Sequence, residues 1–527
     1  MIRKSAKRAD SAPGAKTPLV LAMLRPDFYP HRPDSIELVQ THVSWVFLAG
    51  DRVYKIKKPV DFGFLDYSTL PLRKKACETE VLLNRRLSRN VYLGTAAIYR
   101  RGEIFSLSPP GRIADYAVIM RRLPKEAFLS TLLARGLATT AQVRSVARRI
   151  ALFHAGAPPA MRKLQAISVL EQNLRENFRQ TLPYLGRTVR EKDYLVVWDY
   201  NRTFLEQRRP LLEKRISDGR IREGHGDLHA EHICLDKGVQ IYDCIEFSPR
   251  IRQGDVAADV AFLYMDLLYH GHPVLARVFM EEYLGKTADW ELRLLVPFYA
   301  CYRAVVREKV ESFRITDPSV PRREKTAAAR RAGRYFSLAR SLAEGDAQPR
   351  LIIVGGLPGT GKSTVAGALA ARLGADYLNS DVVRKELAGL EPGKTGAAPF
   401  GGGIYTTTVT ELTYDELLAR AAISLQAGRS IVLDATFSRE KWRRKASGLA
   451  RRLKAVMVAV ECHCPPGVVQ ARIEERQKRG GVSDAGWEIY RALRRHYEPY
   501  LTPRVRVDTS RALEEGLAKI AGAAYPF

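Results

Sequence analysis

Cysteine is scarce in this sequence, since only six of the 527 residues are cysteine. No two of them form a CxxC pair, and their spacing is not typical of a zinc site. Cys462 and Cys464 flank His463 in an apolar run typical of a strand, so we expect core packing there instead of metal binding. A disulfide scaffold is therefore excluded, and the low cysteine count favours a reducing compartment.

Long hydrophobic runs are also lacking. The most apolar stretch, residues 292–306, is broken by Arg293, Pro297 and Arg303, so it does not predict a membrane span. No apolar segment follows the basic residues 1–18, which predict a disordered tail instead of a signal peptide. We therefore expect a cytoplasmic protein with no membrane partner, and the sequence gives no indication of its oligomeric state.

Acidic residues are outnumbered by basic ones. The chain has 85 Lys and Arg against 57 Asp and Glu, a net charge of +28. Such a charge favours anionic partners such as nucleotides, phosphorylated metabolites or nucleic acid. An arginine- and alanine-rich composition alone also yields a basic protein, and no basic motif interleaved with aromatic residues supports nucleic-acid binding. The net charge is therefore the only feature of the sequence that supports nucleic acid as a partner.

The length predicts two or three domains. Short strand-like runs and turns come first, then mostly helical patterns, then a polar stretch that predicts an exposed connecting helix, then a second α/β pattern. The predicted segments are a tail (1–18), an N-terminal domain (19–311, with lobes 19–120 and 121–311), a helical linker (312–349) and a C-terminal domain (350–527). The expected fold class is mixed, with α+β and α/β parts, the latter built on a parallel sheet.

The most specific motif is Gly356–Ser363, which fits the pattern G-x-x-x-x-G-K-[ST]. An apolar run at Leu351–Val354 predicts a strand before it, and an alanine-rich stretch predicts a helix after it. This arrangement aims backbone N–H groups and a helix N-terminus at phosphate oxygens, with Lys362 on the β- and γ-phosphates and Ser363 on Mg²⁺. The predicted ATP-binding residues are Gly356, Leu357, Pro358, Gly359, Thr360, Gly361, Lys362, Ser363 and Thr364.

Two carboxylates follow at the ends of later predicted strands. Asp381 can face the γ-phosphate and accept a proton from an acceptor hydroxyl, although the spacing fits a helix cap equally well. Asp434 ends the apolar run 430–433, where a Walker B carboxylate holds Mg²⁺. Arg472 and Arg476 share one face of a later predicted helix, which is either a lid that brings arginine to the phosphates or a solvated basic face.

Together these residues resemble the P-loop kinase-type ATPases, a group with zeta-toxin-like, gluconate-kinase-like and polynucleotide-kinase-like members. The resemblance covers residues 350–500. It implies ATP and Mg²⁺ as cofactors, Asp381 as the base on the acceptor side and Arg384 as a substrate contact. It also implies that Arg472 and Arg476 act as lid arginines.

A second constellation lies upstream, in the motif HGDLH at residues 225–229. An exposed loop carboxylate followed by a carboxylate at the end of a hairpin is the pairing that phosphoryl transfer uses. Asp227 would accept or orient the acceptor hydroxyl, and Asp243 would hold Mg²⁺ against the phosphates.

A lysine and a glutamate complete this second set. A predicted hairpin carries Lys55 and Lys57 on one face of its second strand. The helical pattern that follows offers Glu80, with Glu78 beside it, as the ion-pair partner of the phosphate-binding lysine. The spacing favours Lys55, but strand alternation does not exclude Lys57.

In this order the residues resemble the aminoglycoside phosphotransferase and choline-kinase-like group, which has a eukaryotic-like kinase fold. The resemblance spans residues 35–310 and implies a bilobal kinase domain that binds ATP through Lys55 and Glu80. That family carries a metal-binding asparagine five residues after the catalytic aspartate, where this chain has His232. A neutral imidazole is a poorer Mg²⁺ ligand than an oxygen donor, so the activity of this domain stays open.

The sequence predicts an ATP-dependent phosphotransferase that transfers the γ-phosphate of ATP to a hydroxyl of a small or polar acceptor. In one alternative only the P-loop domain is catalytic, and the N-terminal domain is a regulatory or scaffold lobe. In a second alternative the chain is a nucleotide-driven nucleic-acid-binding protein.

Overall fold

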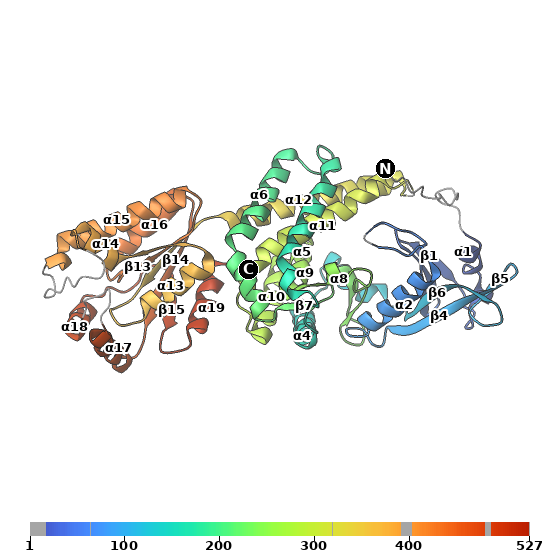
Figure 1. The fold of residues 1–527 in the computed structure, drawn as a ribbon, viewed down its shortest axis with the longest axis horizontal. Coiled ribbons are helices and arrows are strands. Elements are labelled where there is room, and N and C mark those ends of the chain that lie inside the picture. Colours follow the sequence, from blue (N-terminus) through green and yellow to red (C-terminus); the bar gives the residue numbers. More distant parts are fainter. Residues whose placement is uncertain (1–16, 64, 319, 391–402, 480–485, 526–527) are drawn as a thin grey trace. The chain divides into compact units, whose positions relative to one another are not determined.

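The computed structural model describes residues 17–63, 65–318, 320–390, 403–479 and 486–525. By their contacts the residues divide into two compact units (Figure 1). The N-terminal unit contains residues up to 198, 212–288 and 299–340, and the P-loop unit contains residues 199–211, 289–298 and 341 onward. This division does not test the predicted boundaries at residues 311 and 349, which stay predictions. The first helix begins at Pro18, and most of the predicted tail, residues 1–16, lies outside the described residues.

A six-stranded antiparallel sheet forms the first part of the N-terminal unit, in the order β1-β2-β3-β6-β4-β5. Its strands are β1 (Ile36–Gln40), β2 (Ser44–Ala49), β3 (Arg52–Lys57), β4 (Tyr92–Arg101), β5 (Ile104–Ser106) and β6 (Arg112–Arg121). Helix α1 (Pro18–Ala22) precedes the sheet, and α2 (Leu70–Asn84) packs against β4 and β6. Cys77 and Val81 of α2 meet Val53 and Val118 of the sheet in a buried cluster. This packing brings one face of α2 to the face of β3 that carries both lysines.

Helices and short strands make up the stretch that follows. They are α3 (Leu129–Ala134), α4 (Thr140–Gly156), α5 (Ala166–Thr181), α6 (Glu191–Gln207), α7 (Arg209–Ser217), β7 (Ile221–Glu223), β8 (Ile233–Cys234), β9 (Gln240–Ile241), α8 (Pro249–Arg252), β10 (Gln253–Asp255), α9 (Val256–Tyr269), α10 (Pro273–Thr287), α11 (Leu292–Thr316) and α12 (Arg322–Ala347). Helix α9 is buried along most of its length because its sequence is apolar on nearly every face. The side chain of Asp255 caps it by accepting a hydrogen bond from the Ala257 amide.

The expected exposure of the linker helix is wrong. Helix α12 has a buried face, on which Tyr335 is 2% and Phe336 is 1% exposed. The Tyr335 ring stacks on Tyr269 with the ring centroids 3.7 Å apart. Alanines and aromatic residues recur at helical spacing along α12, with arginines between them. The composition of the segment is therefore basic although one face of the helix is apolar, and composition alone suggested a solvated helix.

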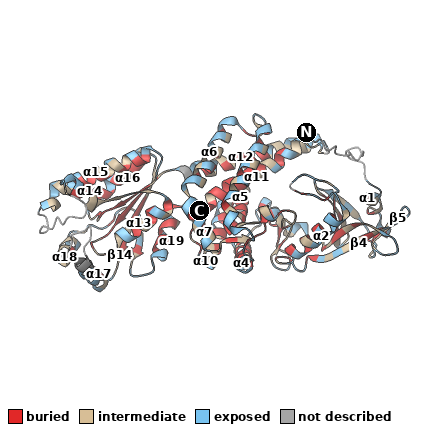
Figure 2. Cartoon of the chain, in the orientation of Figure 1, coloured by how far each residue is buried: buried red, intermediate tan, exposed pale blue. Residues whose placement is uncertain are grey.

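The P-loop unit contains a five-stranded parallel sheet in the order β12-β13-β11-β14-β15. Figure 1 labels β13, β14 and β15 of this sheet. Its elements are β11 (Arg350–Gly355), α13 (Lys362–Leu373), β12 (Asp376–Asn379), α14 (Ser380–Leu387), α15 (Thr407–Gln426), β13 (Ile431–Asp434), α16 (Glu440–Arg452), β14 (Val456–His463), α17 (Pro466–Arg479), α18 (Trp487–Arg495), β15 (Val505–Asp508) and α19 (Leu513–Ala524). Strand β11 is buried at every residue, as expected for a central strand covered on both faces. Figure 2 shows buried residues in red along the strands of this sheet. The mixed fold class is confirmed.

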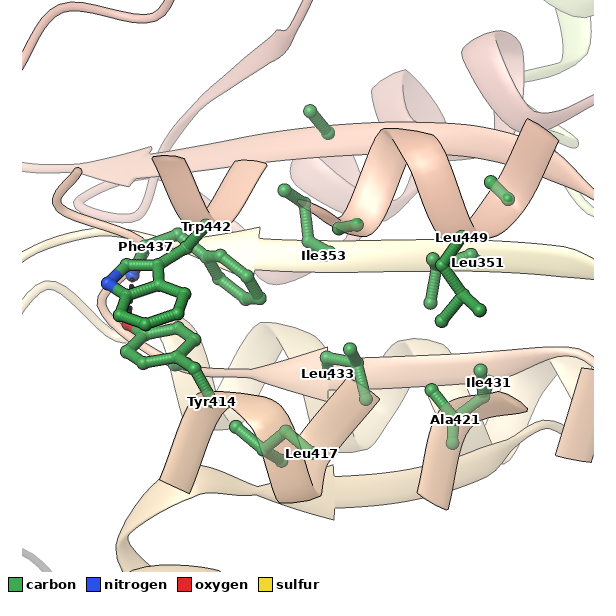
Figure 3. Packing of buried hydrophobic residues seen from close by; sticks show 14 of the residues in the cluster. Leu351, Ile353, Tyr414, Leu417, Ala421, Ile431, Leu433, Phe437, Trp442 and Leu449 are labelled. Atoms are coloured by element: carbon green, nitrogen blue, oxygen red, sulfur yellow. Dashed lines mark hydrogen bonds between the residues drawn. The ribbon is translucent and has the colours of Figure 1, made fainter. Parts of the chain in front are cut away.

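An aromatic cluster fixes the segment after β13 (Figure 3). The rings of Tyr414 and Trp442 stack with centroids 4.5 Å apart. The Phe437 amide donates a hydrogen bond of 2.9 Å to the Tyr414 hydroxyl. These contacts hold the chain just beyond Asp434, at the edge of the sheet where the strands end. Cys462 is buried in β14, as predicted for a core residue.

None of the helices in the described part of the chain is both long enough and apolar enough to span a bilayer.

Two glycines near the P-loop allow a matched stability test. Gly356 has φ +146°, and a Cβ there would lie 2.6 Å from the Cys462 carbonyl oxygen. We expect Gly356→Ala to lower the free energy of unfolding by about 1 to 3 kcal/mol, because backbone must move to admit the methyl group. An added Cβ at Gly367, in the middle of α13, would meet no atom within 4 Å beyond the adjoining helix backbone, so Gly367→Ala should raise stability by up to about 1 kcal/mol. Urea unfolding followed by tryptophan fluorescence measures both, and equal effects would contradict the packing around Gly356.

Candidate active sites

The P-loop joins β11 to α13 at the carboxyl edge of the sheet. Gly359 and Gly361 have φ values of +79° and +76°, which favour glycine, and α13 begins at Lys362 directly after Gly361. The Thr360 hydroxyl donates a 2.7 Å hydrogen bond to the Leu357 carbonyl and so fixes the turn. The loop and the first turn of α13 border a cavity of about 780 Å³. A helix N-terminus facing a cavity is suited to an anion such as a phosphate.

Asp434 occupies the position predicted for the Mg²⁺ carboxylate. It ends β13, lines the cavity and is 1% exposed. Its Oδ2 accepts hydrogen bonds from the side-chain Nδ2 of Asn379 at 2.6 Å and from the Tyr377 hydroxyl at 2.9 Å. Its Oδ1 is buried and makes no hydrogen bond among the described residues. A buried carboxylate oxygen without a donor fits a bound cation or its water ligand, so Asp434 and the Ser363 hydroxyl are suited to Mg²⁺.

Asp381 lines the same cavity from the first turn of α14. Asn379 caps this helix, because its side chain accepts hydrogen bonds from the amides of Asp381 and Val382. The capping alternative for Asp381 is therefore wrong, and its carboxylate faces the cavity rim without a capping bond. Arg384 is buried and also lines the cavity, and its Nη1 donates to the Ile404 carbonyl at 3.0 Å and the Thr410 hydroxyl at 3.1 Å.

Of the two lid arginines, the side chain of Arg476 lies outside the described residues. Arg472 lies beside the P-loop, with Nη1 and Nη2 donating to the hydroxyl and carbonyl of Thr509 at 3.1 and 2.7 Å. The Thr509 hydroxyl in turn lies 2.8 Å from the Thr360 carbonyl. Arg472 is thus tied to the loop through Thr509, which the sequence did not single out.

Several further side chains line the cavity without having been predicted. They are Tyr377, Asn379, Tyr405, Thr410, Glu411, Arg439 and Lys441. Tyr377 and Asn379 lie in β12, and polar residues at the end of a parallel strand are the signal that could have found them. Thr410 and Lys441 reach the cavity from α15 and α16, whose approach depends on tertiary packing.

In the N-terminal unit, both candidate lysines contact Glu80. The Lys55 ammonium lies 2.9 Å from Glu80 Oε1 and 2.7 Å from Asp243 Oδ1. The Lys57 ammonium lies 2.5 Å from Glu80 Oε2 and pairs with Glu246. Only Lys55 therefore joins the glutamate of α2 to the aspartate predicted to hold metal. Glu78 instead forms a long exposed pair with Lys74 at 3.7 Å.

The opposite charges in this cluster shift one another's pKa values. Burial lowers the pKa of Lys55, but the carboxylates of Asp243 and Glu80 outweigh burial and raise it well above its ordinary value. Burial raises the pKa of Asp243, but the positive charges around it, the Lys55 ammonium first among them, together outweigh burial, so the net pKa lies below the ordinary value. A cationic lysine beside an anionic aspartate is the pair that ATP phosphates and their metal require.

The HGDLH loop is held by a buried aspartate in α9. Asp259 accepts hydrogen bonds from the amides of His225 at 2.6 Å and Gly226 at 2.9 Å. His154 of α4 lies 3.4 Å from the same carboxylate and 2.8 Å from the Tyr283 hydroxyl. Asp227 follows directly and is partly exposed, with its Oδ2 lying 3.5 Å from His232 Nδ1. The structure thus brings Asp227, His232, Asp243 and Lys55 together in one unit.

Residues 351–500 match the protein family described as an AAA domain. The matched range contains the P-loop, Asp381, Asp434 and Arg472. The match and the parallel sheet together define the C-terminal part as a P-loop nucleotide-binding domain.

Over nearly its whole length the chain is similar to mycobacterial proteins. The uncharacterized protein Rv2004c of Mycobacterium tuberculosis (strain ATCC 25618 / H37Rv) is 33% identical over 494 residues, which cover 92% of this chain and 94% of that protein. The uncharacterized protein Mb2027c of Mycobacterium bovis has the same identity and coverage. The chain belongs to the family of these proteins.

Two solved structures are similar to parts of the chain at low TM-scores. A choline/ethanolamine kinase family protein from Mesorhizobium loti is 14% identical, covers 62% of this chain and 100% of that chain, and has a TM-score of 0.37. A gluconokinase from Sinorhizobium meliloti 1021 is 18% identical, covers 34% and 92%, and has a TM-score of 0.26. At these identities neither likeness bears on the reaction, and the resemblance to aminoglycoside phosphotransferases stays a prediction.

Proposed function

We propose that the P-loop unit is an ATP-dependent phosphotransferase, which moves the γ-phosphoryl group of ATP to a hydroxyl of a small or polar acceptor. The observation that carries the proposal is the cavity that places the P-loop, Asp434 and Asp381 around one space. Lys362 and the N-terminus of α13 would hold the phosphates, while Ser363 and the free Oδ1 of Asp434 would hold Mg²⁺. The metal would neutralise charge on the β- and γ-phosphates.

Asp381 distinguishes this proposal from simple ATP hydrolysis. It lines the cavity two residues after Asn379, which pairs with Asp434 on the neighbouring strand and already provides the helix cap. It is therefore free to accept the proton of an acceptor hydroxyl. Arg384 and Tyr405 also line the cavity. The Arg384 guanidinium lies over the Tyr405 ring, 5.1 Å from the ring centroid, which is a cation–π contact.

Replacing this carboxylate tests the proposal. We expect Asp381→Asn to lower the rate of phosphoryl transfer by about 100- to 10,000-fold, the range for losing a positioned base, while ATP binding persists. Transfer from labelled ATP to a panel of sugars, antibiotics and oligonucleotide ends measures the rate. The control is Asp415→Asn, which removes an exposed carboxylate that pairs with Lys445 on the same unit. Full transfer by Asp381→Asn would refute the assigned base.

The N-terminal unit is a second candidate for phosphoryl transfer. Its supporting observation is the Lys55 ammonium, which bridges Glu80 and Asp243. In this candidate Lys55 would bind the phosphates of a second ATP, Asp243 would hold Mg²⁺ and Asp227 would accept the hydroxyl proton. A regulatory or scaffold role for this unit is the alternative, and nucleic-acid binding has only the net charge of +28 in its favour.

A further inference from the structure

Asp227, His229 and His232 bring three potential ligands together after β7. One ligand atom of each residue lies within 4.8 Å of the other two. The Oδ2 atom of Asp227 lies 3.5 Å from Nε2 of His229, and the two imidazole centroids are 4.1 Å apart. This is the only such group of three in the part of the chain that the structure describes. The cluster is distinct in composition from the oxygen-only sites that Mg²⁺ prefers.

The hydrogen bond of His232 determines which ring nitrogen is free. Its Nδ1 lies 2.9 Å from the backbone carbonyl oxygen of Asp227. A carbonyl only accepts, so Nδ1 carries the proton, and the neutral ring keeps a lone pair on Nε2. That Nε2 lies 3.6 Å from Oδ2 of Asp243, so a lone pair faces a carboxylate oxygen. A cation between them would resolve the repulsion, and a backbone carbonyl on Nδ1 is the usual way in which a metal-binding histidine is oriented.

His229 is a buried member of the cluster. Its side chain is 1% exposed, and its Nδ1 makes no hydrogen bond within the described residues. The carboxylate oxygen closest to Nδ1 among its ion-pair partners, Glu231 Oε2, is 3.7 Å away, beyond hydrogen-bond distance. The nitrogen that faces the cluster is Nε2, which lies 3.5 Å from Asp227 Oδ2. With the ring proton on Nδ1, the lone pair of Nε2 is directed at the shared member of the cluster and is available to a metal ion.

We propose that Asp227, His229 and His232 bind a divalent first-row transition-metal ion of the zinc and cobalt class. Two imidazole nitrogens and one carboxylate oxygen form a donor set that suits these borderline ions, whereas Mg²⁺ and Ca²⁺ select oxygen donors. Asp243 lies next to the Nε2 of His232 and could add a fourth ligand.

The proposal does not depend on the activity of either candidate site. A bound ion would occupy the carboxylate of Asp227, which then could not accept the proton of an acceptor hydroxyl. The metal content would therefore decide whether the N-terminal unit has a free base. Arg307 lies 3.4 Å from Glu231 and offsets the acidic charge beside the cluster.

Metal titration of the full-length chain tests this proposal. The protein is stripped with a chelator, and Co²⁺ binding is followed by its visible d–d absorption, with Zn²⁺ and Mg²⁺ as competitors. We expect Zn²⁺ to displace Co²⁺ and Mg²⁺ to have no effect at matched concentration. His232→Asn should weaken Co²⁺ binding by more than the about 10- to 100-fold that loss of an outer-shell partner costs. It should also admit Mg²⁺, because an amide oxygen replaces the imidazole.

The matched control is His42→Gln, which removes a half-exposed histidine of the same unit. It should bind Co²⁺ as the unaltered chain does. Cys464 and other thiols elsewhere can also bind Co²⁺. The test therefore compares the Co²⁺ affinity of His232→Asn with that of His42→Gln. If circular dichroism shows that His232→Asn does not fold, His229→Gln takes its place. Equal Co²⁺ affinity in the unaltered chain and the cluster variant, or equal affinity for Mg²⁺ and Zn²⁺, would overturn the proposal.

Discussion

Lys362→Ala is expected to lower ATP turnover by the P-loop unit by about 100- to 1000-fold, the range for losing one charged stabiliser of a transition state. Lys362 is the first residue of α13 and lines the cavity with Ser363. Its ammonium would contact the β- and γ-phosphates, where charge shifts during transfer. Initial rates of ADP formation at saturating ATP measure the effect.

Lys519→Ala is the control, because this exposed lysine of α19 donates to the Arg506 carbonyl and does not line the cavity. Activity that persists in Lys362→Ala would belong to the N-terminal unit, and adding Asp243→Asn should then abolish it. Unchanged turnover in Lys362→Ala, with the remainder insensitive to Asp243→Asn, would disprove both candidate sites.

Lys57→Met is expected to lower the free energy of unfolding of the N-terminal unit by about 3 to 5 kcal/mol. Lys57 is 1% exposed and lies between two buried carboxylates, Glu80 and Glu246. Removing its ammonium leaves Glu246 buried with only the Tyr67 hydroxyl, at 2.5 Å, as a donor among its described contacts. Chemical denaturation followed by circular dichroism gives the change in stability.

A compensating variant separates lost charge pairing from lost packing. Lys57→Met combined with Glu246→Gln should recover part of the stability, because the stranded charge is gone. Lys74→Met, which breaks the exposed 3.7 Å pair with Glu78, should cost at most about 1 kcal/mol. Equal losses in Lys57→Met and Lys74→Met would show that the buried network does not stabilise the unit.

The P-loop could be predicted because its chemistry is local. The glycines, Lys362 and Ser363 lie within eight residues, and the apolar run before them fixes the strand. The fold class followed in the same way from alternating patterns of strand and helix. The partners of Asp434 could not be predicted, because Asn379 and Asp434 are paired in register on neighbouring parallel strands far apart in the sequence.

The choice between Lys55 and Lys57 shows a second limit. Strand alternation places both lysines on one face of β3. The sequence does not show that each carboxylate oxygen of Glu80 contacts a different lysine. The two lysines differ because Lys55 also contacts Asp243, whereas Lys57 also contacts Glu246. Both carboxylates lie almost two hundred residues later in the chain. The proximity of His229 to His232 likewise depends on a short turn, whose geometry the motif alone did not specify.

The division of the chain into units has a consequence for dissecting the protein genetically. The P-loop unit includes residues 289–298, where Glu291 pairs with Arg372 at 2.6 Å and Trp290 donates to Glu514 at 2.9 Å. A fragment that starts at residue 349 would lack these partners and leave the Arg372 guanidinium without its buried carboxylate. Domain swaps and gene truncations at the apparent linker would therefore separate the P-loop unit from residues that belong to it.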